Sequence, residues 1–307
     1  MTRRLSKLVE EGWLLSSGST RAVYKLANKC FIGKVYSLEG ELDESICFTQ
    51  NFRPYFAPFL PDNVMRIFEH GFTEMLNNAI DHSEGKRVFI GASLSEDQLR
   101  VRLGDDGVGV FGKIVESLNL PDKRLALLEL SKGKFTSDPS KHSGQGIFFT
   151  SRMFDHFVII ANDLQYDHEE KKIDVLAETC NDSASVFLGT RVDMVISRKS
   201  KRIAAEVFQE YSDDPCEDLF TKTIVPVRLA SIGGENLISR SQGKRLYTRF
   251  ERFEIVILDF AGVDEIGQAF ADEVFRVFVQ AHPNVSISTR NTNDAIDRMI
   301  RRARAGM

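Results

Sequence analysis

The stretch Glu74-Met75-Leu76-Asn77-Asn78-Ala79-Ile80-Asp81-His82 decides the fold that we predict for this chain. Four of its polar side chains are spaced at i, i+4, i+7 and i+8 and therefore share one face of an α-helix: Glu74, Asn78, Asp81 and His82. Apolar residues at helical spacing run from residue 63 to 82 and predict a long helix anchored in a core. A polar stripe on such a helix needs a partner, and an oxygen-coordinated Mg²⁺ with phosphates would supply one.

A second polar cluster, Asp105-Asp106-Gly107-Val108-Gly109, directly follows an alternating stretch from Leu99 to Leu103 that predicts a strand. A carboxylate at the end of a strand can accept a hydrogen bond from an exocyclic amine. Glycines let the backbone approach a flat ring closely and turn with positive φ. A cluster of this kind can therefore accept a ring with an amino group, and we expect Asp106 to face solvent.

A third cluster, His142-Ser143-Gly144-Gln145-Gly146-Ile147, leads into a predicted helix from Ile147 to Phe154. Glycines just before a helix present free N–H groups and the positive end of the helix dipole, which favours phosphate. No G-x-x-x-x-G-K-[ST] motif occurs, so a classical phosphate loop is excluded.

In this order, with predicted strands between them, the three clusters resemble the GHKL (Bergerat-fold) ATPases. This superfamily includes gyrase, Hsp90, MutL, histidine kinases and anti-sigma serine kinases. The resemblance covers residues 60 to 197 and adds Gly189-Thr190, where the family places a threonine near the adenine. It implies an α/β sandwich in which helices lie on one face of a mixed, mainly antiparallel sheet.

The resemblance also implies a role for each matching residue, with ATP and Mg²⁺ as the bound groups. Asn78 would ligate Mg²⁺, and Glu74 would be the catalytic base that positions or activates the attacking water or hydroxyl. Asp105 would hold the adenine amino group. The remaining ATP contacts would come from the adenine-pocket glycines, the phosphate-side glycines and the threonine: Gly107, Gly109, Gly144, Gly146 and Thr190.

Two features of this site stay open. His82 and Asp81 take either a phosphate- or metal-side role or a plain helix-end cap. The stretch from Phe111 to Lys141 would be a mobile ATP lid. Its lysines either meet phosphate charge or lie on a solvated lid surface: Lys132, Lys134 and Lys141.

Near the C-terminus, a buried strand from Ile255 to Phe260 is followed by Ala261-Gly262-Val263-Asp264-Glu265-Ile266-Gly267 and an amphipathic helix. This pattern resembles a STAS domain of the anti-sigma-antagonist kind. Such antagonists carry a phosphorylatable serine in the loop before this helix, whereas residues 264–269 here contain no serine or threonine. Phosphorylation of this domain by its own ATPase neighbour is therefore disfavoured.

The predicted organisation has five parts. Residues 1–27 form a helix and a hairpin, either a partial winged-helix-like element or a structural extension. Residues 28–62 are a linker, 63–197 the GHKL ATP-binding domain, and 198–222 a charged linker. Residues 223–307 alternate strands and helices, which predicts a small STAS-like α/β domain.

Composition limits the alternatives. With 40 Lys and Arg against 44 Asp and Glu, the net charge of −4 argues against a protein that mainly coats nucleic acid. Four widely spaced cysteines without a C-x-x-C pair favour neither a zinc knuckle nor a disulfide framework, so we expect a cytoplasmic protein. The lack of any run of about 18 apolar residues predicts no membrane span.

Three functions remain. The first is a regulatory Mg-ATPase whose nucleotide-dependent lid controls the STAS-like domain or a protein partner, such as a regulator or sigma-factor-like protein. The second is an anti-sigma-type serine/threonine protein kinase acting on a separate protein. The third is an ATP-sensing, DNA-binding transcription regulator that uses the winged element. A homodimer is compatible with all three.

Overall fold

The computed structural model describes residues 2–18, 22–26, 30–135, 144–169, 175–178, 189–212, 220–232 and 235–306. The chain divides into two compact units. The first comprises residues 1–110, 150–163 and 180–204, and the second comprises residues 111–149, 164–179 and 205–307. The domain boundaries expected from the sequence stay predictions.

The first unit opens with the predicted helix and hairpin. Helix α1 (Thr2–Glu10) is followed by strands β1 (Leu14–Ser17) and β2 (Val23–Leu26), which pair antiparallel. The ring of Trp13, between α1 and β1, is buried and stacks on Tyr55 at 5.6 Å between ring centroids. The hairpin is thereby anchored to the rest of its unit by aromatic packing.

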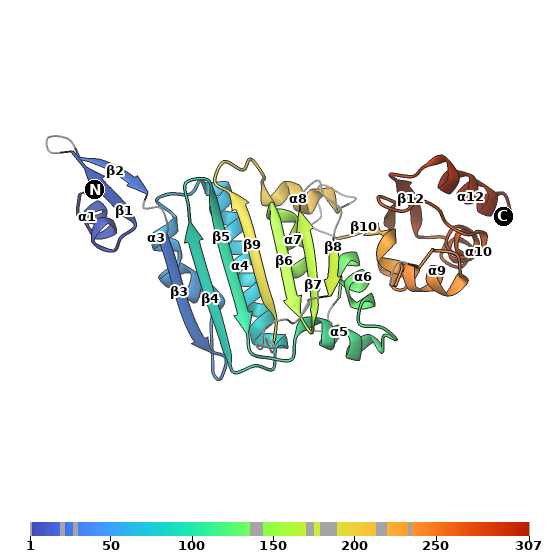
Figure 1. The fold of residues 1–307 in the computed structure, drawn as a ribbon, viewed down its shortest axis with the longest axis horizontal. Coiled ribbons are helices and arrows are strands. Elements are labelled where there is room, and N and C mark those ends of the chain that lie inside the picture. The colour runs from blue at the N-terminus through green and yellow to red at the C-terminus, as the bar shows by residue number, and fades with distance from the viewer. Residues whose placement is uncertain are drawn as a thin grey trace. The chain divides into compact units, whose positions relative to one another are not determined.

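The largest sheet that the structure describes has seven strands (Figure 1). Its order is β3 (Cys30–Ser37), β4 (Arg87–Leu94), β5 (Gln98–Asp105), β9 (Arg191–Ser197), β6 (His156–Ala161), β7 (Leu164–Glu169) and β8 (Val175–Glu178). The pairings β3–β4, β4–β5, β5–β9, β6–β9 and β7–β8 are all antiparallel. The mixed α/β class with a mainly antiparallel sheet is therefore confirmed. Strand β7 was not predicted, because its polar residues follow a short turn.

The long helix α4 (Asp62–His82) lies across one face of the sheet (Figure 1), as the helical period predicted. Its apolar side meets helices α2 (Glu44–Asn51) and α3 (Arg53–Phe56) in a cluster of five fully buried rings: Phe48, Phe52, Phe56, Phe68 and Phe72. Neighbouring rings in this cluster have centroids 4.9 to 6.2 Å apart. Residues 28–62, expected to be a linker, thus supply a strand of the sheet and three of these rings.

The second unit contains a three-stranded parallel sheet in the order β10 (Lys222–Pro226), β11 (Ile255–Asp259) and β12 (Ser286–Arg290). Helix α9 (Arg240–Tyr247) lies between β10 and β11 in the chain. Helix α10 (Gln268–Asp272) continues through a π-helical segment (Glu273–Phe278) into α11 (Val279–Ala281), and α12 (Asp294–Ala305) ends the unit. This alternation of strands and helices was predicted for residues 223–307.

The stretch expected to be a lid contains two helices, α5 (Val110–Leu118) and α6 (Leu125–Lys132), and helix α7 (Gly146–Met153) follows it. Helix α8 (Ala204–Glu210) lies in the stretch expected to be the charged linker. Among the described residues, no helix combines the length and the apolarity needed to cross a bilayer.

The aromatic cluster gives a direct test of the core. The substitution Phe68→Ala removes a ring that is 0% exposed, and it should lower the free energy of unfolding by about 3–5 kcal/mol because a cavity remains. Val35→Ala, at a side chain that is 65% exposed, is the control and should change stability little. Denaturant unfolding measures both; equal effects of the two variants would contradict this description of the core.

Candidate functional site

The candidate site centres on Asp105, the last residue of β5. Its side chain is buried, and its Oδ1 accepts hydrogen bonds from the backbone N–H of Gly107 (2.9 Å) and of Thr190 (3.2 Å). Within the described ranges no hydrogen bond reaches Oδ2. One carboxylate oxygen therefore orients the side chain, and the other is available as an acceptor.

The electrostatic setting of this carboxylate is unusual for an aspartate. Burial raises the pKa of Asp105 above its usual value, and the hydrogen bonds from Gly107 and Thr190 offset this only in part. A buried carboxylate with an accepting oxygen suits a ligand that brings its own N–H donor, because that donor compensates the lost hydration.

The loop after Asp105 packs closely against the end of α4. Val108 N–H donates to the carbonyl oxygen of Ser83 at 2.8 Å, and a Cβ on Gly107 would overlap that same oxygen. Gly109 has φ of +81°, and a Cβ there would overlap the side chain of Asn162. Both glycines are therefore required by close approach to other parts of the chain. Their predicted approach to a flat ligand ring stays a prediction.

The start of β9 closes the other side of the site. Asp105 N–H donates to the carbonyl oxygen of Thr190 at 3.0 Å, and Thr190 Oγ1 accepts from Val110 N–H at 2.9 Å. Gly189 has φ of +117°, and a Cβ there would overlap the Asp105 backbone. The structure thus brings together four of the predicted site residues: Asp105, Gly107, Gly109 and Thr190.

Two residues of this cluster were missed by sequence reasoning. Ser83 supplies the carbonyl that receives Val108, and the Asn162 side-chain amide donates to the carbonyl oxygen of Val108 at 3.0 Å. Neither belongs to a recognisable motif. Their contribution is a contact with the backbone of a segment far away in sequence, so no local signal identifies them.

Helix α4 carries the predicted polar stripe. Glu74 and Asn78 are partly buried, His82 is partly buried at the end of the helix, and Asp81 is exposed. Nδ2 of Asn78 is buried without a hydrogen-bond partner in the described part of the chain. A side-chain amide in this state fits a polar ligand beside α4. The two alternatives for His82 and Asp81 stay open.

The described residues contain no cluster of three or more His, Cys, Asp or Glu side chains that could hold a metal on their own. A Mg²⁺ ion does not require one, since it commonly takes one or two protein oxygens and completes its shell with phosphates and water. The Asn78 amide oxygen, one turn after the Glu74 carboxylate, is compatible with that mode of binding.

Asp106 is exposed, as predicted, whereas its neighbour Asp105 is buried. It accepts hydrogen bonds from the backbone N–H groups of Lys86 (2.8 Å) and Arg87 (2.9 Å) and from Arg87 Nε (3.1 Å). The hydrogen bonds from Arg87 are the main cause of a pKa below the usual value. Asp106 therefore has a structural role, because it ties the end of β5 to the start of β4.

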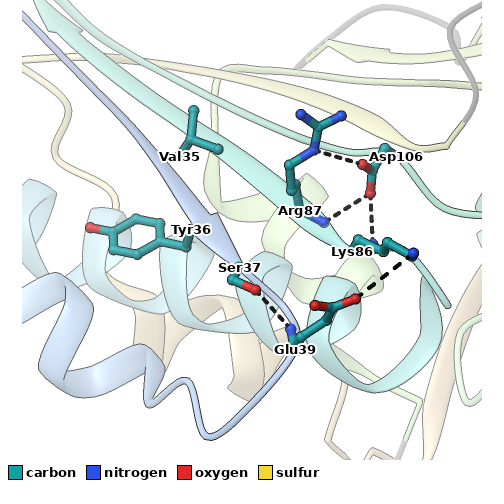
Figure 2. A pocket seen from close by; sticks show the side chains of 7 residues that line it. All are labelled: Val35, Tyr36, Ser37, Glu39, Lys86, Arg87 and Asp106. Atoms are coloured by element: carbon teal, nitrogen blue, oxygen red, sulfur yellow. Dashed lines mark hydrogen bonds and ion pairs between the residues drawn. The ribbon is translucent and has the colours of Figure 1, made fainter.

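Asp106 also lines an open pocket of about 420 Å³ between the ends of β3 and β4 (Figure 2). The charged groups of this pocket pair with one another: Arg87 with Asp106 at 3.1 Å, and Lys86 with Glu39 at 3.9 Å. None of the predicted ATP-binding residues lines it. We therefore place the candidate site at Asp105 and not in this pocket.

The phosphate-side glycines belong to the second unit. Gly144 has φ of +69°, and Gly146 is the first residue of α7, whose first turn is closed by Phe149 N–H donating to the carbonyl oxygen of Gln145 at 3.0 Å. The predicted order of glycines and then a helix is therefore present. Lys141, His142 and Ser143 lie outside the described residues.

The expectation for Lys132 was wrong. Its side chain is 0% exposed, and its ammonium group lies 2.6 Å from Glu129 Oε1, so it neither meets a phosphate nor lies on a solvated surface. Lys134 is partly buried, and its ammonium donates to the carbonyl oxygen of Arg252 at 2.7 Å. Both lysines sit in contacts with the C-terminal part of the second unit, which sequence spacing could not reveal.

Comparison with known families supports the C-terminal assignment. A family profile described as "STAS-like domain of unknown function" (DUF4325) matches residues 242–297, from α9 into α12. The parallel sheet and its helices agree with this match, so the chain has a C-terminal STAS-like domain. A search of curated proteins found no match.

The shifted pKa of Asp105 predicts a pH effect with a definite sign. The unfolded chain ionises near pKa 3.8 and the folded chain only at higher pH, so ionisation of Asp105 costs folding stability as pH rises through that window. Asp105→Asn removes the cost and keeps an acceptor for Gly107 and Thr190. Its stability relative to the unchanged chain should be higher at about pH 7 than at about pH 3.

Asp106→Asn is the matched control for this measurement. The lowered pKa of Asp106 means that its ionised form stabilises the folded state above the unfolded pKa, and that this stability is lost as pH falls. Asp106→Asn should therefore lose more stability at neutral than at acidic pH. Denaturant unfolding at about pH 3 and about pH 7 measures the stability of each variant relative to the unchanged chain. If this relative stability changed with pH in the same direction for both variants, the description of Asp105 would be refuted.

Proposed function

We propose that this chain is a regulatory Mg-ATPase of the GHKL type, in which an ATP-binding domain acts on the C-terminal STAS-like domain or on a protein partner. The observation that carries the proposal is the buried Asp105 carboxylate, oriented by Gly107 and Thr190 with Oδ2 available. The adenine ring has an exocyclic amine that donates a hydrogen bond to such an oxygen. Cytoplasmic ATP levels would make a site of this kind a useful sensor.

The other predicted residues would each take a role in binding or hydrolysing ATP. Asn78 on α4, which is partly buried, would hold Mg²⁺ through its side-chain oxygen, and the metal would neutralise phosphate charge when bound. Glu74, one turn earlier, would accept the proton of the attacking water as that water adds to the γ-phosphorus and ADP leaves. Gly144 and Gly146, at the start of α7, would offer N–H groups to the phosphates.

A protein partner follows from the STAS-like domain. Domains of this kind resemble regulators that bind other proteins, so a regulator or sigma-factor-like protein is the partner that we propose. The kinase alternative shares the same ATP site and differs only in the acceptor of the γ-phosphate. Incubation with γ-labelled ATP, with and without host lysate, separates the two: free phosphate supports the ATPase, and a labelled protein supports the kinase.

Asp105→Asn should lose measurable ATP binding. The substitution replaces the accepting Oδ2 by an NH₂ donor that faces the adenine amine, and an unmatched buried donor costs about 1–3 kcal/mol or more. Titration with a fluorescent ATP analogue measures the affinity. Asp106→Asn, whose exposed carboxylate accepts hydrogen bonds from Lys86 and Arg87, is the control and should bind as before. Unchanged affinity of Asp105→Asn would refute the site.

Glu74→Ala should keep ATP binding and lose turnover. Loss of a general base typically lowers the rate by about 10²–10⁴-fold, which phosphate release measures. Glu69→Ala is a matched control on the same helix, because Glu69 pairs with Arg53 at 3.2 Å and lies more than a turn away from Glu74. Phosphate release at the original rate by the Glu74 variant would rule out its role as the base.

A further inference from the structure

Helix α6 and the three residues after it, which we call the strap (residues 125–135), are built into the C-terminal half of the second unit. All eight residues of α6 are buried, although the helix contains Glu129, Ser131 and Lys132. The Thr223 hydroxyl of β10 donates to the carbonyl oxygen of Lys132 at 2.8 Å. A helix buried all round is a core element of its domain.

A buried ion network holds the strap to the end of α9. The Glu129 carboxylate lies between two cations: Lys132 Nζ is 2.6 Å from Oε1, and Arg249 Nη1 is 3.0 Å from Oε2. All three side chains are at most 7% exposed. In the described part of the chain, no other carboxylate pairs with either cation. Glu129 is therefore the carboxylate paired with both cations, and the charge of Glu251 adds a smaller favourable contribution to each.

Backbone carbonyls complete the network in both directions. Lys132 Nζ donates to the carbonyl oxygens of Thr248 (2.9 Å) and Arg245 (3.3 Å) at the C-terminal end of α9, where a helix has unsatisfied acceptors and a negative dipole end. Arg249 Nη2 in turn donates to the carbonyl oxygens of Gly133 and Lys134 in the strap. The strap thus donates hydrogen bonds to carbonyl groups at the end of α9, and Arg249 beyond α9 donates to carbonyl groups of the strap.

An aromatic chain extends this attachment to the predicted phosphate-binding turn. Phe148, two residues after Gly146 in α7, packs on Phe220 at 4.5 Å between centroids, and Phe220 packs on Phe253 at 5.3 Å. The ammonium of Lys134 lies 4.6 Å from the centroid of the Phe253 ring. The strap and the start of α7 therefore share one aromatic contact surface on the C-terminal half of the unit.

Separating the strap from α9 is physically unfavourable. The side chains of Lys132, Arg249 and Glu129 are all buried, and burial lowers the pKa of Lys132 to about 8 despite the Glu129 charge. Removing the carboxylate from Arg249 would leave a buried guanidinium without a counter-ion, which is strongly destabilising. The contacts at Arg245, Thr248 and Arg249 all lie within the matched STAS-like region.

We propose that the strap is a permanent part of the STAS-like domain and that, through Glu129, it transmits nucleotide binding at Gly144–Gly146 to the α9 end of that domain. The nucleotide part of this inference rests on the proposed function. In this arrangement residues 125–135 of the segment expected to be a mobile lid are fixed to the STAS-like domain. We call the network of Glu129, Lys132 and Arg249 the joint. Lys132 is a cation of this joint and makes no phosphate contact.

Hydrogen exchange of the full chain tests the attachment without any nucleotide. Glu129→Gln keeps the size of the side chain but removes the charge shared by Lys132 and Arg249. Exchange should become faster by more than about tenfold in residues 125–135 and in residues 240–253 together, because a buried ion pair loses one partner. Glu116→Gln, at an exposed glutamate of α5, is the control and should change neither segment. Faster exchange in the strap alone would overturn the joint.

A second variant covers the case in which Glu129→Gln does not fold. Lys132→Met removes the ion pair with Glu129 and the donors to Arg245 and Thr248. It leaves one carboxylate, Glu129, with one guanidinium, Arg249, which is a balanced pair. It should accelerate exchange at the end of α9 and leave the rest of the STAS-like domain protected. Unchanged exchange there would also count against the joint.

Mg-ATP then tests transmission. In the unchanged chain, saturating Mg-ATP should alter exchange in residues 240–253, and in Glu129→Gln it should not, while the affinity for a fluorescent ATP analogue stays the same. If Glu129→Gln bound the ATP analogue more tightly, the contact at Glu129 would inhibit binding, and transmission would be overturned. Transmission would also be overturned if Mg-ATP still altered exchange in residues 240–253 of Glu129→Gln. If no nucleotide binds, the proposed function fails, whereas the result without nucleotide still decides the joint.

Discussion

A buried carboxylate needs hydrogen-bond donors to replace the water that it loses. The loop at the candidate site in the first unit depends on the donors that Asp105 receives. Its Oδ1 takes the backbone N–H groups of Gly107 and Thr190, which lie at the end of β5 and the start of β9. The two strand ends are thereby joined beside the end of α4, where Ser83 receives the N–H of Val108. Side chains at 107, 109 or 189 would overlap this arrangement. The same hydrogen bonds and glycine contacts thus shape the candidate site and hold the loop after Asp105 in place.

The second unit also contains a buried carboxylate, but this one is paired with two buried cations. Glu129 is buried between Lys132 and Arg249, and four backbone carbonyls take the donors that one carboxylate cannot. A hydrophobic replacement of such a network is often neutral for stability, whereas loss of one partner is costly. A joint of this type is therefore specific in geometry and sensitive to single substitutions. Those are properties expected of an element that links a binding site to a regulatory domain.

Much of the fold was predictable because it rests on local periodicity. The helical spacing from residue 63 to 82 predicted α4, alternation predicted β5, and strand–helix alternation predicted the C-terminal sheet. The weak points were segments without a clear period. Strand β7 has a polar face, and α6 lies in a stretch whose apolar run shows no amphipathic face because the whole helix is buried. Phe48 and Phe56 belong to the core, although proline-rich surroundings made them look like linker.

The sequence by itself determined which residue types stand where: a carboxylate and two glycines after a strand, an amide on a polar helix stripe, and glycines before a helix. Backbone conformation and periodicity are local properties, so they can be read from neighbouring residues. Only the tertiary structure decided which distant groups meet. It placed Thr190 and Asn162 against the loop of Asp105, and it buried Lys132 with Glu129 where a solvated or phosphate-binding lysine was expected. Burial and ion pairing arise from segments far apart in the chain, and their energy depends on the water that packing removes.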